Sequence, residues 1–291
     1  MKVFKLFSLL CFITMIGCKN TESDANQSQS SKEETPKERI VSLNGTLSEI
    51  ISELGYQDQI VAVDVTSIYP ENLKENATDL GHVMNLNVEA LLQQKPTLIF
   101  AVKKELSADI ISQLDNLEVP VHYYEPEYSV EGAKKLAAAV AEDLNTKASE
   151  KITKNIENEI EDLKEFSSKP KVMFVYARGA GTLLVAGKET PVAKMIELAG
   201  GENAMNTYDD YRPLTTEAVA QANPDVLLFF NTGLQSVNGK EGLKDIPGLA
   251  NSTAAKKGQV ISMNGLLLTG FGPRTGEAAA KLNKELSQYA K

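Results

Sequence analysis

The chain has no tryptophan, only two histidines and two cysteines, and fewer basic than acidic residues, 30 against 39. The two histidines, His82 and His122, are too few for the histidine-rich cluster of a zinc or manganese carrier. The acidic balance argues against a nucleic-acid-binding protein, because phosphates need a basic surface. Enzyme motifs are missing as well: there is no nucleophile elbow, no metal-binding histidine pair and no phosphate loop with its lysine. We therefore do not expect an enzyme.

The two cysteines, Cys11 and Cys18, both fall in the first 18 residues, MKVFKLFSLLCFITMIGC. Two lysines, an apolar stretch and Gly17 before Cys18 form the layout of a secretory signal with a lipoprotein-type cleavage site. We expect residues 1–17 to be a signal peptide and Cys18 to carry a lipid. An uncleaved membrane anchor is the weaker alternative, because the apolar stretch is too short to span a bilayer comfortably. The processed domain would then have no disulfide, although its compartment is oxidising.

A polar segment, residues 18–37, follows the signal peptide. After Cys18 it reads KNTESDANQSQSSKEETPK and has no aromatic or large aliphatic side chain to bury, so we expect a disordered tether. Without the two lysines of the signal peptide, 28 basic and 39 acidic residues remain, a formal charge of −11. About 250 residues follow the tether, enough for two modest domains or one large one.

Residues 38–145 alternate apolar runs with helical patterns. The runs RIVSL, QIVAV, TLIFAV and VPVHYY are typical of buried strands. Between them, TLSEIISELG and SADIISQLDNL have helical spacing, and Gly55 is placed to end the first helix. This order predicts an α/β lobe with a mainly parallel sheet covered by helices.

A charged stretch within residues 146–168 separates this block from a second one. Its apolar residues Ile152, Ile156, Ile160 and Leu163 recur every three or four positions, which predicts one amphipathic helix of about five turns. A helix of that kind would be about 30 Å long and would allow only limited hinge motion between the parts it joins.

Residues 169–291 repeat the α/β pattern with KVMFVYA, PVAKMIELAG, PDVLLFF and QVISM. The chain is therefore expected to form two lobes, each with a mainly parallel sheet, joined by one long backbone helix. The ligand of such a protein would lie between the lobes, where strand ends and loops face each other. Because the joint is stiff, we expect a large ligand in a mostly preformed groove.

The two blocks share a local pattern. VEALLQQKPTLIF and TEAVAQANPDVLLF both have Glu-Ala, a short helix, a proline, one further residue and an apolar strand. Glu89 and Pro96 have the same spacing as Glu217 and Pro224. The match favours two similar lobes, although helix-proline-strand joints are common enough for it to arise by chance.

Six segments carry a resemblance to a known family: RIVSLNGTLSEIISELG, VAVDVTSIYP, LGHVMNLNVEALLQQKPTLIF, VYARGAGTLLVAGKETPVAKMIELAGGENA, YRPLTTEAVAQANPDVLLFF and LLLTGFGPRTGEAA. The chain resembles the haem-binding lipoproteins that supply bacterial haem ABC importers. These belong to the periplasmic-binding class with a helical backbone joint, which also contains cobalamin- and siderophore-binding proteins. The resemblance implies a monomer in the cell envelope, lipid-anchored on the periplasmic or extracellular face, that captures haem and delivers it to a permease with its ATPase. A siderophore or cobalamin carrier of the same class is the alternative.

The resemblance implies that Tyr69, in the loop after the second strand, binds the haem iron. Ferric iron accepts a phenolate, and tyrosine is a known axial haem ligand. The ferric ion and nearby cations would have to favour the phenolate, since a free tyrosine has a pKa near 10. The alternative is an ordinary loop residue, held in an extended conformation by the proline that follows it.

The same resemblance brings Arg178 and Arg274 to the cleft as ligands of the haem propionates or of the phenolate, roles that suit a guanidinium. Arg178 could instead be a surface residue at a strand end, and Arg274 could pair with an acid of its own lobe. His82 is a weaker candidate for haem contact and His122 weaker still, because a lone histidine is more often structural. Met84 and Met263 are either groove-lining or core residues.

In the wider class, one exposed glutamate per lobe docks on arginines of the two permease subunits. Glu89 and Glu217 match that pattern. The alternative is that each acid only stabilises the start of its own helix through the helix dipole.

Overall fold

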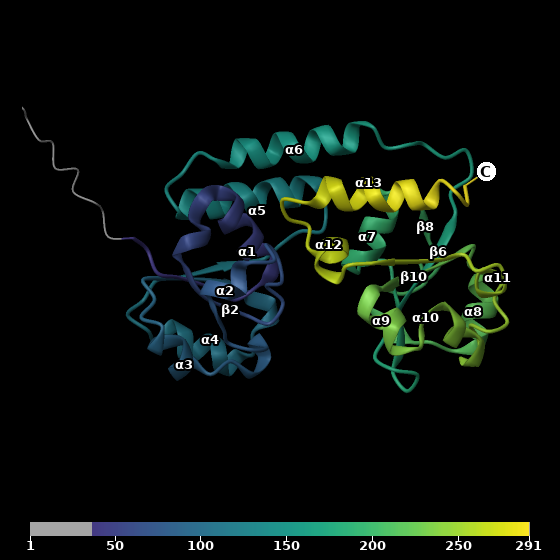
Figure 1. Cartoon of the computed structure of the whole chain (residues 1–291), viewed down its shortest axis with the longest axis horizontal. Helices are drawn as coiled ribbons and strands as arrows, with labels where there is room; N and C mark the ends of the chain where they lie inside the picture. The colour runs from purple at the N-terminus through teal and green to yellow at the C-terminus, as the bar shows by residue number, and fades with distance from the viewer. Residues whose placement is uncertain (1–36, 291) are drawn as a thin grey trace, which may run out of the picture. The chain divides into compact units, whose positions relative to one another are not determined.

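The computed structural model describes residues 37–290 (Figure 1). The signal peptide, Cys18 and residues 18–36 of the expected tether lie outside the described residues. Within 37–290, the helices are all too short or too polar to cross a membrane.

The first sheet has five strands in the order β3-β2-β1-β4-β5, and all its neighbouring strands are parallel. The strands are β1 (Ile40–Ser42), β2 (Ile60–Val63), β3 (Thr78–Asp79), β4 (Leu98–Val102) and β5 (Val121–Tyr124). Every residue of β1 and β4 is buried, which is why these strands appear in the sequence as unbroken apolar runs.

Helices cover both faces of this sheet. The α-helices are α1 (Gly45–Ile51), α2 (Leu73–Asn76), α3 (Val88–Gln93), α4 (Ala108–Asp115) and α5 (Val130–Asp143). Short helical turns are η1 (Ser52–Tyr56, π), and the 3₁₀ turns η2 (Gln57–Gln59), η3 (Val83–Asn85) and η4 (Lys103–Glu105). α1 and α5 share one apolar cluster with the sheet, and α3 and α4 share the other. Gly55 has φ +92° and ends the first helical segment, as its position predicted.

The second sheet is mixed. Its main path is β11-β10-β6-β7-β9, with β8 paired to β6. The strands are β6 (Lys171–Ala177), β7 (Leu183–Ala186), β8 (Glu202–Asn203), β9 (Tyr211–Pro213), β10 (Val226–Phe230) and β11 (Val260–Met263). β6, β10 and β11 are parallel and were expected, whereas β7 is antiparallel to both β6 and β9 and was not. The chain doubles back after β6 through a turn with Gly179 in a left-handed conformation, so the next strand forms a hairpin.

The second lobe also has helices on both faces of its sheet. They are α7 (Pro191–Leu198), α8 (Thr216–Ala222), α9 (Asn231–Ser236), α10 (Gly239–Gly242), η5 (Leu243–Asp245, 3₁₀), α11 (Thr253–Lys256), α12 (Gly265–Thr269) and α13 (Thr275–Leu286). α7, α12 and α13 share one apolar cluster, and α8, α9 and α11 contribute to the other.

The helix between the sheets is α6 (Ser149–Glu161), which lies within the expected linker, residues 146–168, but is shorter than the predicted five turns. Its 13 residues span about 20 Å. Ile152 and Ile156 are buried against the first lobe, as their spacing predicted, but the helix ends before Leu163, which packs with the second lobe. The apolar residues of this stretch therefore pack in two different cores. The helix has to end before Leu163 so that this residue can reach the core of the second lobe.

The joint is a packed pair of helices. α13 of the second lobe lies beside the C-terminal part of α6 and also contacts α5 (Figure 1). Gly276 permits this close approach, because a Cβ there would lie 2.5 Å from the Cβ of Glu159. Two helices in contact stiffen the connection in the way that one longer helix was expected to do.

The sequence repeat corresponds to an equivalent joint in the two lobes. α3 leads into β4 beside β1, and α8 leads into β10 beside β6. The residue after each proline makes the same bonds: Thr97 N–H donates to Arg39 O and Asp225 N–H donates to Lys171 O, both at 2.9 Å. In return, the side chains of Thr97 and Asp225 accept from the backbone N–H of Arg39 and Lys171. The repeat is therefore structural and not a chance match.

Candidate ligand-binding site

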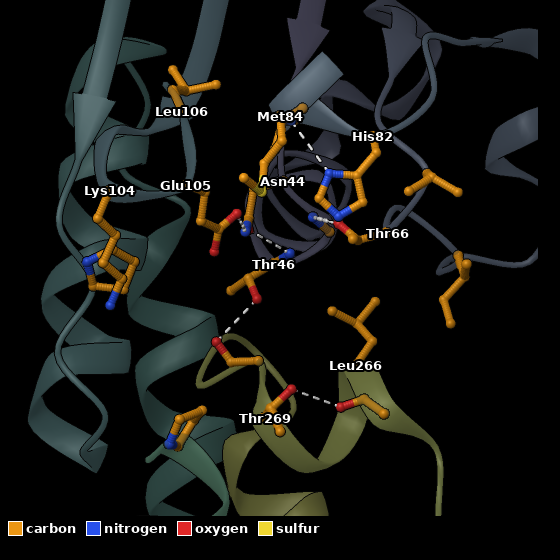
Figure 2. Close-up of a pocket in the computed structure, with 18 of the residues that line it drawn as sticks. Asn44, Thr46, Thr66, His82, Met84, Lys104, Glu105, Leu106, Leu266 and Thr269 are labelled. Atoms are coloured by element: carbon orange, nitrogen blue, oxygen red, sulfur yellow. Dashed lines mark hydrogen bonds between the residues drawn. The ribbon is translucent and has the colours of Figure 1, made fainter. Parts of the chain in front are cut away.

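A cavity of about 660 Å³ lies between the two lobes (Figure 2). The first lobe lines it with Asn44, Gly45, Thr46, Val65, Thr66, Ile68, His82, Val83, Met84, Lys104, Glu105, Leu106, Ser107, Pro126 and Tyr128, and the second with Pro191, Phe230, Gly265, Leu266, Thr269 and Gly270. Each of the five strands of the first sheet is followed by residues of this wall, and so is β11 of the second sheet, while β10 ends at the wall residue Phe230. The cavity is therefore at the carboxyl ends of the strands, where open α/β sheets bind ligands.

The floor of the cavity is a rigid polar network at the start of α1. Asn44 caps this helix, accepting hydrogen bonds from Thr46 N–H at 2.9 Å and Leu47 N–H at 3.2 Å. Gly45 N–H donates to Thr66 Oγ1 at 2.9 Å, and a Cβ at position 45 would lie 2.5 Å from the carbonyl oxygen of Thr66. The glycine therefore allows the loop after β2 to pack directly on the helix terminus.

Buried Asp64 fixes the loop that follows β2. Its carboxylate accepts hydrogen bonds from the hydroxyls of Thr66 at 2.6 Å and Ser67 at 2.7 Å. The Ser67 hydroxyl is also bonded to that of Ser48 in α1, at 2.7 Å. All these groups find partners within the protein, so the loop carrying residues 65–69 has a defined conformation.

Large apolar side chains are exposed around the cavity. Val65, Ile68 and Met84 line it and are 42%, 46% and 63% exposed. Side chains of this kind are normally buried, and their gathering in one cavity is typical of a site for an apolar ligand.

The polar side chains of the wall come mainly from the first lobe. Lys104 donates from Nζ to the hydroxyl of Tyr128 at 2.6 Å. Glu105 accepts a hydrogen bond from Asn44 Nδ2 at 3.0 Å (Figure 2). Burial raises the pKa of the Glu105 carboxyl, and the hydrogen bond from Asn44 only partly offsets this rise. His82 Nδ1 accepts from Met84 N–H at 3.3 Å, which holds the imidazole at the cavity wall.

Tyr69 lies beside this cavity and does not line it. Its ring covers the guanidinium of Arg274, with Cζ 3.7 Å from the ring centroid, in a neighbouring cavity of about 150 Å³ that Glu49 also lines. Ile68, the residue before it, does line the large cavity. Tyr69 is 39% exposed, so its phenol is accessible to solvent in this arrangement.

Arg274 forms an ion pair between the two lobes. Its Nε donates to Glu49 Oε2 at 3.0 Å, and its Nη2 donates to Glu49 Oε1. Glu49 belongs to α1 of the first lobe, so the expected alternative of a partner within its own lobe is wrong. Gly272 lets the arginine's loop approach α1, since a Cβ there would lie 2.6 Å from Thr46 Cγ2. Nearby, the Thr46 hydroxyl donates to Gly270 O at 3.0 Å (Figure 2).

The other expected residues lie outside the cavity wall, with the exception of Met84. Arg178 is exposed at the end of β6, with Cζ 5.6 Å from the ring centroid of Tyr176, whose ring packs against the cavity residue Phe230. His122 is paired with Asp143 at 2.9 Å, and Met263 is a buried core residue.

Glu89 and Glu217 are exposed in the first turns of α3 and α8, at the equivalent joints described above. α3 and α8 each cover the sheet face opposite to the one that α5 or α13 covers. The two acids thus occupy matching places in the two lobes. Neither acid is among the residues that line the cavity.

Sequence reasoning missed Lys104, Tyr128, Phe230 and Leu266 as cavity residues. Lys104 and Phe230 stand at or just after the ends of runs that were recognised as strands, TLIFAV and PDVLLFF. Their position at carboxyl ends of parallel strands was a usable signal. Among residues 37–290, no group of three or more His, Cys, Asp or Glu side chains is arranged to hold a metal ion.

A family model described as periplasmic binding protein matches residues 40–265. An uncharacterized ABC transporter substrate-binding lipoprotein of Bacillus subtilis, YvrC, is 26% identical over 275 residues, covering 91% of this chain and 85% of the relative. The vitamin B12-binding protein of Vibrio campbellii is 27% identical over 227 residues, covering 75% of this chain and 80% of the relative.

Solved structures show the same fold. The periplasmic heme-binding protein RhuT from Roseiflexus sp. RS-1, in its apo form, has a TM-score of 0.84 and 35% identity, covering 88% of this chain and all of RhuT (100%). The periplasmic heme-binding protein BhuT in complex with two hemes has a TM-score of 0.81 and 30% identity, covering 87% of this chain and 98% of BhuT.

Proposed function

Because the chain belongs to the periplasmic binding protein family, we propose that it captures haem in the cavity between its lobes and delivers it to an ABC importer. At the coarser level it is a substrate-binding protein of an ABC transporter and not an enzyme. The observation that carries the haem proposal is the exposed apolar wall of Val65, Ile68 and Met84 in a cavity of about 660 Å³. A flat, largely apolar macrocycle would cover these side chains, and the heme-binding neighbours RhuT and BhuT support this choice.

We propose Tyr69 as the ligand of the ferric iron, with His82 as a further contact on the wall. Tyr69 directly follows cavity residue Ile68, so a side-chain rotation that keeps the ring near Arg274 would turn the phenol oxygen toward the bound haem. Arg274 would then lie close to the developing phenolate and favour it electrostatically. Because Arg274 already donates two hydrogen bonds to Glu49 and lies outside the cavity wall, we assign propionate contact to the exposed Arg178 instead.

The remaining parts of the proposal concern partners and location. Cys18 would carry the lipid, as the B. subtilis lipoprotein relative supports, and hold the monomer on the periplasmic or extracellular face of a membrane. Glu89 and Glu217, one on each lobe, would dock on the two halves of the permease. Leu92, an exposed apolar residue one turn after Glu89 on α3, would add apolar contact to the first of these sites.

A cobalamin carrier is the second candidate, because vitamin B12-binding proteins are among the relatives. Cobalamin is much larger than haem, and it needs no tyrosinate.

The test is a titration of the full-length protein in detergent with hemin and, in parallel, with cyanocobalamin. We expect saturable hemin binding at one or two equivalents, with the charge-transfer band of a five-coordinate ferric tyrosinate complex. Tight binding of cyanocobalamin with no saturable hemin binding would overturn the haem proposal in favour of the second candidate.

A further inference from the structure

We propose that Lys104, together with the Tyr128 hydroxyl, forms the subsite of the cavity that binds a carboxylate group of the ligand. This inference rests on the proposed function, because it names which part of a haem molecule faces which wall. Lys104 and Tyr128 follow β4 and β5, and neither the sequence motifs nor the family resemblance indicated them as binding residues.

Among residues 37–290, Lys104 is the only lysine or arginine that lines the cavity. The arginines first expected to meet an acidic group lie elsewhere: Arg274 is bound to Glu49, and Arg178 is outside the wall. Lys104 would therefore hold an acidic group inside the cavity, whereas Arg178 would meet one only where it projects beyond the wall.

The Lys104 ammonium has donors to spare. It donates to the Tyr128 hydroxyl at 2.6 Å, and it lies 4.2 Å from the centroid of the same ring. An ammonium group has three donors, and the described part of the chain offers no carboxylate within 4.0 Å of this one. Its neighbour Glu105 instead accepts from Asn44, as Figure 2 shows. The lysine is thus positioned by an aromatic ring and has no carboxylate in ion-pair contact among residues 37–290, although its charge acts to lower the pKa of the neighbouring Glu105 carboxyl.

Tyr128 fixes this arrangement between the lobes. Its ring packs against Phe271 of the second lobe, with centroids 5.7 Å apart, and is half-buried. Because its hydroxyl accepts the bond from Lys104, its own hydrogen is free to point at an anion. The ammonium and the phenol would together offer a carboxylate two donors at one corner of the cavity.

The acidic charge of the protein makes a cationic group in the cavity important for binding an acidic ligand. Without the signal peptide the formal charge is −11, which on average repels an anionic ligand, so a local cation favours its binding. Haem has two propionates on one edge and an apolar remainder, which fits Lys104 and Tyr128 on one side and Val65, Ile68 and Leu266 on the other. The corrin edge of cobalamin carries amides in place of carboxylates, so it would gain less from this lysine.

The experiment compares hemin with hemin dimethyl ester, in which both propionates are esterified, using the full-length protein in detergent. Lys104→Met removes the charge and keeps most of the stem, Lys104→Arg keeps the charge, and Lys103→Met is the matched control. Lys103 is the preceding residue, exposed and outside the cavity wall, with Nζ 5.8 Å from the ring centroid of Tyr123.

We expect Lys104→Met to weaken hemin binding about tenfold at low salt, equivalent to about 1.4 kcal/mol, and to leave ester binding unchanged. Lys104→Arg should keep most of the affinity for hemin, and Lys103→Met should match the parent for both ligands. The parent's preference for hemin over the ester should shrink as salt is raised. Unchanged ester binding also shows that the variant is folded.

Two results would overturn the subsite. In the first, the parent binds hemin, and Lys104→Met either binds hemin equally well or loses affinity for hemin and the ester alike. Lys104 then does not bind the carboxylate, and the proposed function stands without the subsite. If the parent binds neither hemin nor the ester, the proposed function is wrong and the subsite falls with it.

Discussion

Removing one partner of the ion pair between Glu49 and Arg274 should destabilise the protein, because the remaining partner would be a largely buried charge without its counter-charge. Glu49 is 6% exposed, and the Arg274 side chain is 18% exposed. Replacing Glu49 by Gln keeps the size of the side chain but leaves a guanidinium in a site with little water. Removing one partner of a buried pair costs about 3–5 kcal/mol, and the partial exposure of Arg274 lowers our expectation to about 2–4 kcal/mol.

Urea unfolding of the full-length protein in detergent measures this loss. With a denaturant slope of about 3 kcal/mol per molar urea, the midpoint of Glu49→Gln should fall by about 1 M. The matched control is Glu127→Gln, which breaks a 3.5 Å pair with Lys135 in which both side chains are more than 60% exposed, and it should leave the midpoint nearly unchanged.

A double-mutant cycle separates the pair from the effects of each substitution. Glu49→Gln combined with Arg274→Gln should cost less than the sum of the two single changes by about 1–2 kcal/mol, because the double variant has no unpaired charge. The reasoning would be refuted if the urea midpoint of Glu49→Gln equals that of the exposed control. It would also be refuted if the free-energy losses of the two single changes simply add in the double variant.

Three further predictions concern the proposed function. Tyr69→Phe keeps the ring over Arg274 but removes the oxygen, so the tyrosinate band should vanish in the absorbance spectrum and haem should dissociate faster by about tenfold or more; an unaltered spectrum would falsify the ligand assignment. Cys18→Ser should abolish lipidation and release a protein that still binds hemin, as fractionation and gel mobility would show; recovery in the membrane fraction with unchanged mobility would contradict this. Glu89→Lys combined with Glu217→Lys should leave hemin binding intact but sharply reduce haem uptake and stimulation of the transporter ATPase, with each single change weaker and Glu241→Lys, at an exposed site on α10, as the control. Uptake by the double variant equal to that of the parent would leave only the helix-end role.

Most of the central strands were predictable because a strand buried on both faces consists of consecutive apolar residues. RIVSL, QIVAV, TLIFAV and PDVLLFF contain β1, β2, β4 and β10. β9 has partly polar, exposed residues at a sheet edge and lacks that signal. β7 is the short apolar run LLVA, and its antiparallel direction follows from the glycine turn that precedes it. The linker helix was predicted too long because the apolar spacing continues to Leu163 while the helix stops at Glu161.

Local sequence also determines which loops reach the site, because residues that follow parallel strands gather at one edge of a sheet. For this reason His82 lies in the cavity wall and Tyr69 lies beside it. Local sequence does not determine which side chains meet there. Glu49 and Arg274 are 225 positions apart, and Lys104 and Tyr128 are 24 apart in separate loops. Their pairing depends on how the two lobes pack through α6 and α13, and on glycines such as Gly272 that let backbones approach. The spacing of residues along a chain reflects the repeat of a single helix or strand, whereas a contact between lobes depends on how all the helices and strands pack. Only the folded protein therefore showed that Arg274 is paired with Glu49, and that Lys104 has no carboxylate partner within residues 37–290.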